Sequence, residues 1–361
     1  MGATIHDVAR RAGVSISTVS RVLNQTANVS KRRRARVREA AAALGYSPNP
    51  AARSLLGRSS GSLGIVLPYI TGEFFSEFLH GIDTVAQEHD LYCFVSSSHR
   101  NDGEFAHVLR EIGRRADGLL IMATETEAKT LATLLPQGLP IVFVNTPPFD
   151  QALEGVLLHH DHDAIRFDNR GGAYAIAQHV IEQGARRLTV VRGPMRAYDA
   201  EERLAGIRAA MGDAGLDVAR LTVVQGDYTQ EAGYRAGQRI VEQGDRPDAV
   251  MACNDLCAIG VLRALREARI RVPDDVMVTG FDDTPLARYV SPPLTSAHVP
   301  IRDIGAWAVK RLVLRIRGAQ GGGLGSEGDL GPEGSLRPER IMMPVALVPR
   351  TSTGYPETPS D

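Results

Sequence analysis

The sequence predicts a small all-α head followed by a larger α/β body. In the first 60 residues, apolar residues recur at helical spacing between glycine and Ser/Thr residues. From residue 61 onward, short apolar runs rich in β-formers alternate with amphipathic helical runs. The length of 361 residues exceeds that of one typical domain. We therefore expect at least two structural units.

The charge is divided unevenly between these two units. Residues 1–60 contain eleven Lys and Arg residues against two Asp and Glu residues, a net charge of +9. The remaining thirty basic and forty acidic residues give the body a net charge of −10. A basic head on an acidic body favours a polyanionic partner for the head. A disordered basic tail or a membrane-surface segment would lack the regular apolar pattern of this head.

Cysteine usage and the N-terminus exclude several classes of protein. Three cysteines are too few for a disulfide scaffold, and Cys253 and Cys257 lie in an apolar strand-to-helix run that favours buried thiols over a metal site. The first ten residues have no apolar signal region, and no run approaches the ~18 apolar residues of a membrane span. We expect a soluble cytoplasmic protein without a metal or cofactor.

Three helices are predicted in the head. Thr4 and Gly13 suit the start and end of the first helix, and Ser15 suits the start of the second, residues 16–23. Ser30 is expected to cap a third helix that Gly45 ends. The apolar residues predicted to face inward are Ile5, Val8, Ala9, Ala12, Val19, Val22, Leu23, Val37, Ala40, Ala41 and Leu44. Two short helices joined by a tight turn and braced by a third form a helix-turn-helix.

The head and the segment after it resemble the LacI/GalR family of transcriptional regulators. The resemblance rests on TIHDVARRAGVSISTVSRVLN and VSKRRRARVREAAAALGYSPNPAARSLLG, in which turn, cap, third helix and hinge follow at the family's spacing. It implies a DNA-binding regulator in which Ile16, Ser17 and Arg21 of the second helix contact base edges. Ile16 could instead pack between helices. The residues expected to hold phosphates are Thr18, Asn24 and Ser30.

The segment 48–58 is expected to be a short hinge helix. Pro50 suits its first turn and Gly57 its end, but a helix this short is marginal alone in water. The resemblance implies that two hinge helices lie side by side in the minor groove, where Leu55 wedges a base step and the small Ala52 permits close approach. Leu55 could alternatively contact the body.

The alternation of strand and helix runs in the body predicts two parallel sheets covered by helices on both faces. Its strand runs include LGIVLPY, DGLLIMAT and IVFVN, and later LTVVRG, AVMACND and VMVTGFDD. The resemblance implies a two-lobed core like that of periplasmic binding proteins, crossed near 162, 292 and 330–340. The expected ranges are a head at 1–47, a first lobe at 61–162 plus 293–318, a second lobe at 163–292 plus 339–351, and a flexible Gly-rich insertion at 319–338.

Candidate ligand residues lie where predicted strands end, because ligands of open α/β folds bind beyond the carboxyl ends of strands. Arg203 is added because its RLAG context matches the family. Together these amides, charged groups and rings suit a polyhydroxylated ligand. The expected effector residues are Phe74, Phe75, Asn145, Arg203, Tyr228, Asn254 and Asp282.

Structural roles remain open for several of these residues. Asn254 could cap the next helix, Asp282 or Asp283 could likewise be a cap, and at least one of Phe74 and Phe75 is expected in the core.

Two other classes of function were weighed against a regulator. An enzyme on this α/β body is disfavoured because no P-loop, GxSxG, HExxH or credible dinucleotide motif is present. The HHDHD run at 159–163 suits a solvated turn better than a metal site. A transport receptor is disfavoured by the basic head and the missing signal. We expect a homodimeric repressor that binds a pseudo-palindromic double-stranded DNA operator and a sugar effector.

Overall fold

The structure, a computed structural model, consists of two compact units, Met1–Ser60 and Gly61–Asp361. The residues that it describes are 3–23, 29–46, 60–98, 102–126, 128–147, 162–244, 246–319 and 336–355. Several predicted features lie outside these residues: Asn24, the hinge 48–58 with Ala52 and Leu55, His159, His160, and all but the ends of the 319–338 insertion. No helix among the described residues is long and apolar enough to cross a membrane.

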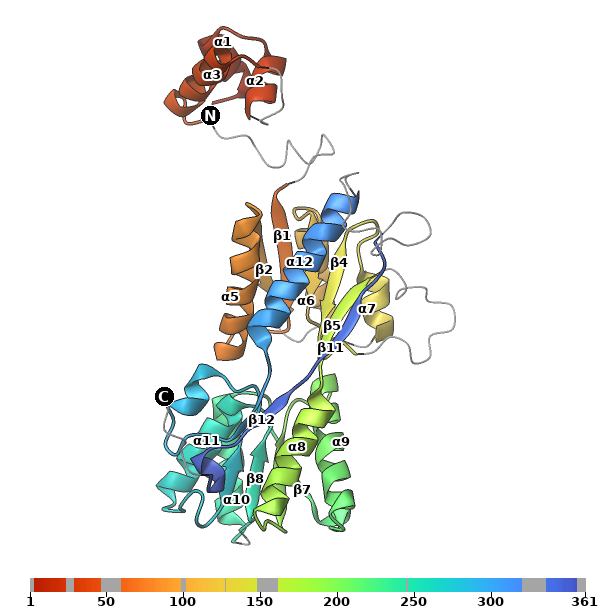
Figure 1. Cartoon of the computed structure of the whole chain (residues 1–361), viewed down its shortest axis with the longest axis vertical. Coiled ribbons are helices and arrows are strands. Elements are labelled where there is room, and N and C mark those ends of the chain that lie inside the picture. The colour runs from red at the N-terminus through yellow and green to blue at the C-terminus, as the bar shows by residue number, and fades with distance from the viewer. Residues whose placement is uncertain are drawn as a thin grey trace. The chain divides into compact units, whose positions relative to one another are not determined.

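The head contains the three predicted helices, α1 (Ile5–Ala12), α2 (Ile16–Leu23) and α3 (Lys31–Ala43) (Figure 1). The Thr4 hydroxyl accepts from the Asp7 amide, and the Asp7 carboxylate accepts from the Thr4 amide at 3.0 Å. Gly13 ends α1 with a left-handed φ of 61°, which costs glycine little. Ser15 Oγ accepts from the Thr18 amide at 3.2 Å, as a cap for α2 should.

The prediction that Ser30 caps α3 is wrong for its side chain. Ser30 occupies the N-cap position with extended backbone, but its hydroxyl makes no capping hydrogen bond. The head's core follows the prediction more closely, since the small and branched residues of all three helices form one buried cluster. That cluster comprises Val8, Ala9, Ala12, Val19, Val22, Val37, Ala40 and Ala41, with Ile5, Leu23 and Leu44 partly buried against it.

The first sheet of the body has six parallel strands in the order β11-β5-β4-β3-β1-β2. Parallel strands need helical crossovers, and these cover both faces of the sheet. The strands are β1 (Ser62–Leu67), β2 (Tyr92–Ser97), β3 (Gly118–Ile121), β4 (Ile141–Val144), β5 (Asp163–Phe167) and β11 (Arg340–Met343). The helices are α5 (Glu73–Glu88), α6 (Asp102–Gly113), α7 (Ala128–Leu134) and α12 (Ile301–Ala319).

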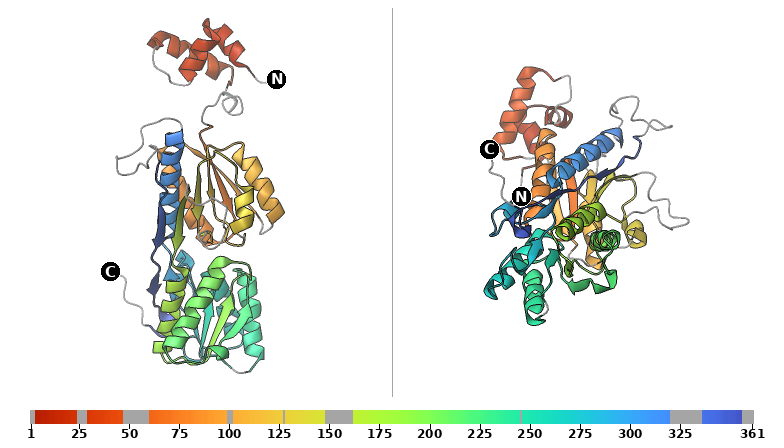
Figure 2. Two further views of the ribbon diagram at one scale, coloured as in Figure 1. Left: turned by 90° about the vertical axis from the view of Figure 1, so that its right-hand side faces the viewer. Right: turned by 60° about the horizontal axis from the view of Figure 1, so that its bottom comes forward.

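The second sheet has four parallel strands in the order β7-β6-β8-β9, and a two-stranded antiparallel ribbon pairs β10 with β12. The two larger sheets follow one another along the body in Figures 1 and 2. The strands are β6 (Leu188–Arg192), β7 (Thr222–Gln225), β8 (Ala249–Ala252), β9 (Met277–Thr279), β10 (Ser296–His298) and β12 (Ala346–Val348). The helices are α8 (Asn169–Glu182), α9 (Tyr198–Asp213), α10 (Gln230–Glu242) and α11 (Asp255–Glu267), with short 3-10 turns η1 (Val218–Arg220), η2 (Pro285–Arg288) and η4 (Thr351–Thr353).

Three of the expected lobe boundaries are wrong. The first lobe was expected to resume at residue 293, but β10 is bridged to the second half, where His298 lies opposite Asp282. The second lobe was expected to begin at residue 163, but β5 pairs with β4 in the first sheet, where Val144 lies opposite Ile165. It was also expected to include 339–351, but β11 pairs with β5. Within the described residues the chain crosses between the sheets after Phe167, between β10 and α12, and between β11 and β12. The short DAIRF run is bounded by polar residues on both sides, and no pattern in it indicates which sheet it joins.

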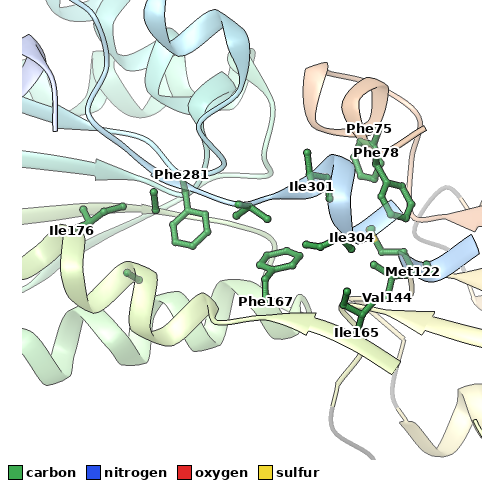
Figure 3. Close-up of a cluster of buried hydrophobic side chains, with 14 of the residues drawn as sticks. Phe75, Phe78, Met122, Val144, Ile165, Phe167, Ile176, Phe281, Ile301 and Ile304 are labelled. Carbon is green, nitrogen blue, oxygen red and sulfur yellow. The ribbon is translucent and has the colours of Figure 1, made fainter. Parts of the chain in front are cut away.

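A single hydrophobic cluster runs through both halves of the body. It joins α5 and α12 beneath the first sheet to α8 and α9 beneath the second (Figure 3). Phe167 at the end of β5 and Phe281 after β9 are both about 2% exposed and lie in this cluster where the halves meet. This hydrophobic packing therefore holds the segments that cross between the halves. The predicted ligand residues lie near the same segments.

Helix pairs of the second half approach each other at glycines. A Cβ on Gly233 of α10 would lie 2.0 Å from the Cys257 carbonyl oxygen of α11, and one on Gly260 would lie 2.1 Å from the Gln230 oxygen. No side chain fits at such distances. The two glycines therefore set how closely these helices pack, and α11 carries Asn254 at its N-cap.

A buried carboxylate joins α12 to the first sheet. Asp163 is fully buried, and its oxygens accept from Arg311 Nη2 at 2.9 Å, from Arg315 and from the Glu339 amide at 2.6 Å. Burial alone would raise the pKa of Asp163, but the hydrogen bonds from Arg315, Arg311 and Glu339 hold that pKa below its ordinary value. Asp163 thus links β5, β11 and α12 through charge.

We expect Asp163→Asn to lower the free energy of unfolding of the body by about 3 kcal/mol, because it leaves the largely buried Arg315 guanidinium without this counter-ion and leaves Arg311 with Glu339 alone. Trp307, the only tryptophan, lies on α12 and reports this unfolding by fluorescence during urea titration. Because the folded pKa of Asp163 is depressed, its contribution is present above the unfolded pKa of about 4 and is lost as the pH falls through the folded value.

The matched control is Asp274→Asn, which removes an exposed pair with Arg271 and should cost about 0–1 kcal/mol. Equal stability of the Asp163 and Asp274 variants at neutral pH would contradict the assignment of Asp163 as a buried link. A stability difference between wild type and Asp163→Asn that persists undiminished at acidic pH would contradict it as well.

Candidate functional site

All seven predicted effector residues line one cavity of about 450 Å³ in the body. Asn145 follows β4, Asn254 follows β8 and Asp282 follows β9, so the carboxyl ends of strands from both sheets meet there. Helix α5 contributes Phe74 and Phe75. The structure therefore brings together residues that are more than 200 positions apart in sequence.

Arg203 is the most tightly held side chain of this cavity. It projects from α9 and is only 7% exposed. Its Nε donates to Asn169 Oδ1 at 2.9 Å, its Nη1 donates to the Cys253 carbonyl, and its Nη2 lies 3.5 Å from Asp282 Oδ1. The guanidinium also stacks over the Phe281 ring, with its carbon 3.7 Å from the ring centroid. A cation this deeply buried needs all of these partners.

The Arg203 contacts continue into a chain of amides. Asn169 accepts from Arg203 and donates through Nδ2 to Asn145 Oδ1 at 3.1 Å. Since Asn145 follows β4 and Arg203 lies on α9, this chain connects the first sheet with the second half of the body. It orients an amide and a guanidinium side by side in the same cavity.

Tyr228, Asp199 and Asn254 form the next part of the wall. The Tyr228 hydroxyl donates to Asp199 Oδ1 at 2.9 Å. Asn254 donates through Nδ2 to the Tyr228 carbonyl at 3.2 Å and accepts from the Cys257 amide at 3.0 Å. The capping role considered for Asn254 is therefore real, and the same side chain lines the cavity.

Burial changes the ionisation of this wall. Desolvation raises the pKa of Asp282 well above its ordinary value, although Arg203 opposes the shift. Desolvation, followed by Asp199, raises the pKa of Tyr228. Burial lowers the pKa of Arg203, but the nearby acids Asp282 and Asp199 oppose this effect, and the pKa stays above its usual value. Arg203 is thus charged and Tyr228 is a neutral hydroxyl at physiological pH.

Three of the cavity residues also have an uncommon backbone conformation. Asn145, Tyr228 and Asp282 have φ values of 46°, 71° and 103°, in the region that side chains other than glycine rarely adopt. Such residues persist only where the surrounding structure holds them, and they concentrate at functional sites. The backbone at the strand ends is therefore arranged to direct these three side chains.

Aromatic rings also line the cavity. Phe74 lies edge-on to Phe75 with ring centroids 5.2 Å apart, and Phe167 lies 6.2 Å from Phe74. Phe75 is buried in the hydrophobic core, whereas Phe74 is half-exposed. The expectation that at least one of the two is a core residue is confirmed.

Asp282 and Asp283 have different environments. Asp283 is directed away from the Arg203 chain and pairs with Arg350 and His298, the latter at 3.1 Å. The neighbouring Asp255 accepts from Thr284 and Ser296, and burial raises its pKa to about 7. Asp282 alone of these three carboxylates lines the cavity with Arg203.

Sequence reasoning missed several residues of the cavity. Phe167 was assigned to the wrong lobe together with β5, and no signal in the sequence separates Asp199 from an ordinary first-turn acid. Asn169, which links Arg203 to Asn145 beside the cavity, was missed as well. The prediction for the two cysteines of the second half can also be compared with the structure, whereas His159 and His160 lie outside the described residues. Cys253 and Cys257 are buried free thiols, and the described part of the chain has no group of three or more His, Cys, Asp or Glu residues suited to a metal ion.

The second helix of the head exposes the residues predicted to read bases. Ile16 is 41% exposed, and Ser17 and Arg21 are exposed as well. Packing between helices, the alternative considered for Ile16, is not what the structure shows. Ser15 Oγ forms hydrogen bonds of 2.8 and 2.9 Å with the hydroxyls of Ser17 and Thr18, which holds both at the start of α2.

Two family models match the chain. "Bacterial regulatory proteins, lacI family" matches residues 4–49, and "Periplasmic binding protein-like domain" matches residues 177–353. The ribose operon repressor of Escherichia coli (strain K12) is 34% identical over 317 residues, which cover 87% of this chain and 93% of that protein.

Solved structures agree with these matches. The lac repressor dimer bound to operator and the anti-inducer ONPF has a TM-score of 0.79 at 25% identity and covers 98% of this chain and 99% of its own. The complex of the transcriptional regulator CelR with cellobiose has a TM-score of 0.66 at 28% identity, with 97% and 99% covered. These similar proteins are regulators rather than enzymes, and the chain belongs to the LacI family of bacterial transcriptional regulators.

Proposed function

We propose that this regulator is a repressor whose operator affinity is set by a neutral sugar bound in the Arg203 cavity. The observation that supports this proposal most directly is that Arg203, Asp282, Asn145 and the phenylalanines line one cavity. Fixed donors and acceptors together with rings suit the hydroxyl edge and apolar face of a sugar. The CelR–cellobiose complex, a similar structure, supports this class of ligand.

The charges of the cavity favour an uncharged ligand. Arg203 is the only cation among its lining residues, and it is already paired with Asp282. Asp199 and Glu231 add two further carboxyl groups. A phosphate or carboxylate group on the ligand would meet this acidic surface at close range, which disfavours sugar phosphates and sugar acids.

For the head, we propose that Ile16, Ser17 and Arg21 contact base edges in the major groove, and that Thr18, Asn24 and Ser30 contact phosphates. The exposure of the start of α2 and the resemblance of the head to the family support these roles. The hinge roles of Ala52 and Leu55 in the minor groove are part of the same proposal and rest on the resemblance alone.

We further propose that the protein acts as a homodimer that binds a pseudo-palindromic operator. The lac repressor, a similar structure, is a dimer on its operator. The body also exposes large apolar side chains on its edge strand β2, where Tyr92 is 74% and Phe94 is 46% exposed. An exposed apolar edge strand requires a partner or some other protection. A second copy placed against β2 would supply it.

Base reading is tested by selecting bound DNA from a random pool with the full-length protein at a fixed salt concentration. The wild type should recover a pseudo-palindrome. Arg21→Ala should relax one position in each half-site, at a cost of about 1–3 kcal/mol, because a bidentate contact to guanine is lost. Leu55→Ala should lose the preference for a deformable centre.

Arg10→Ala provides the control for charge, since Arg10 is exposed on α1. It should weaken binding uniformly and leave the motif unchanged. Recovery of the same motif with Arg21→Ala as with wild type would refute base reading by Arg21.

Effector binding is tested by calorimetry with neutral sugars, D-ribose and cellobiose among them, and with their phosphorylated or oxidised counterparts. A neutral sugar should bind, and Arg203→Lys should weaken it by about tenfold or more, because lysine keeps the charge but loses the planar fork. Arg208→Ala, an exposed residue on the same helix, should bind as wild type does. Preferential binding of a sugar phosphate would contradict the proposal.

The dimer surface is tested by sedimentation equilibrium of Phe94→Asp. A carboxylate there should convert the dimer to a monomer, because it would be buried without a partner. Met342→Asp is the matched control, since Met342 is 52% exposed on β11 at the opposite edge of the same sheet. Dissociation by the Met342 variant, and not by the Phe94 variant, would place the interface elsewhere.

A further inference from the structure

Two hydrogen bonds join the halves of the body directly beside the cavity. Glu73 Oε2, on the helix between β1 and β2, accepts from the Leu286 amide at 2.9 Å, and Leu286 lies in η2 after β9. The Thr124 carbonyl, after β3, accepts from the Tyr198 amide at 3.0 Å, at the start of α9. Each bond therefore links an element of the first sheet to one of the second.

The Glu73 bond replaces a missing cap. The turn η2 begins after Thr284, whose side chain makes no capping hydrogen bond, because its hydroxyl donates to Asp255 at 3.1 Å. The amides at the start of a helical turn have no acceptor within the turn. Glu73 supplies the acceptor for Leu286 from the other half of the body, and a carboxylate makes this a strong type of hydrogen bond.

The residues around this bond border the cavity on both sides. Phe74 and Phe75, which follow Glu73, line the cavity. Asp282 and Thr284, which precede Leu286, line it as well. The turn before Glu73 is also tightly seated. Gly72 has a φ of 92°, and a Cβ there would lie 2.7 Å from Leu256 Cδ1 of α11.

We infer that Glu73 is a positioning residue that holds the two halves of the body closed over the effector cavity and sets Phe74 and Phe75 against it. This inference rests on the proposed function only in naming the enclosed ligand an effector. Glu73 does not line the cavity, so it acts on the ligand through the rings that follow it and through the Asp282 segment. Loss of the Glu73 bond opens the cleft and weakens the second bond, between Thr124 and Tyr198.

Hydrogen–deuterium exchange of the full-length protein, read on overlapping peptides that resolve Leu286 and Tyr198, tests this role without DNA or sugar. Glu73→Ala should speed exchange at both amides by about tenfold or more. Glu73→Gln should give a smaller increase, because its amide oxygen still accepts. Glu77→Ala is the matched control: Glu77 lies one turn further along α5 and pairs with Arg302 of α12, within the first half, so both amides should exchange as in wild type.

Faster exchange at Leu286 with no change at Tyr198 would show a local cap and overturn the inference. No change at either amide would overturn it too, as would an equal rise at the buried strand β8, which would indicate general loosening. None of these results bears on whether a sugar binds or whether the head reads DNA, so this inference and the proposed function can fail separately.

Discussion

The buried guanidinium of Arg203 is the constraint on which the arrangement of the body depends. A cation that is 7% exposed is tolerated only with several compensating partners, and these come from different parts of the chain. Asn169 connects it to Asn145 and the first sheet, whereas Asp282 and the Cys253 carbonyl connect it to the ends of β9 and β8. Arg203 has five N–H donors, so a ligand hydroxyl can be added to the described partners.

This arrangement explains how the cavity can sense occupancy. Its walls come from both sheets, so a ligand that contacts Asn145 and Phe74 of the first half together with Arg203 and Asp282 of the second favours the closed arrangement. A ligand shifts an equilibrium only through its difference in affinity for the two states. Contacts that form only when the two halves are closed set the size of this difference in affinity. They include the hydrogen bonds of Glu73 and of the Thr124 carbonyl.

Much of this architecture is predictable from sequence, and the failures have physical causes. The head could be predicted because caps and core spacing are local signals, and Thr4, Gly13 and Val19 lie where those signals place them. The strand-end rule located Asn145, Asn254 and Asp282 because the carboxyl ends of parallel strands share one edge. The sheet to which β5 belongs depends on pairing with β4 and β11, which no local pattern encodes. Phe167 was therefore missed, and the opposite environments of Asp282 and Asp283 depend on Arg203 and Arg350, which lie far away in sequence.

We propose that occupancy of the Arg203 cavity and DNA binding by the head are coupled. Thermodynamic linkage makes it testable, because two coupled sites change each other's affinity by the same factor. The measurement is the Kd of the bound sugar for the free protein and for the protein saturated with its selected operator, beside the Kd of the operator with and without that sugar. We expect the operator to change the Kd of the sugar, and the sugar to change the Kd of the operator, by the same factor of about 5–150-fold. If both ligands bind and neither changes the Kd of the other, the cavity and the head act independently.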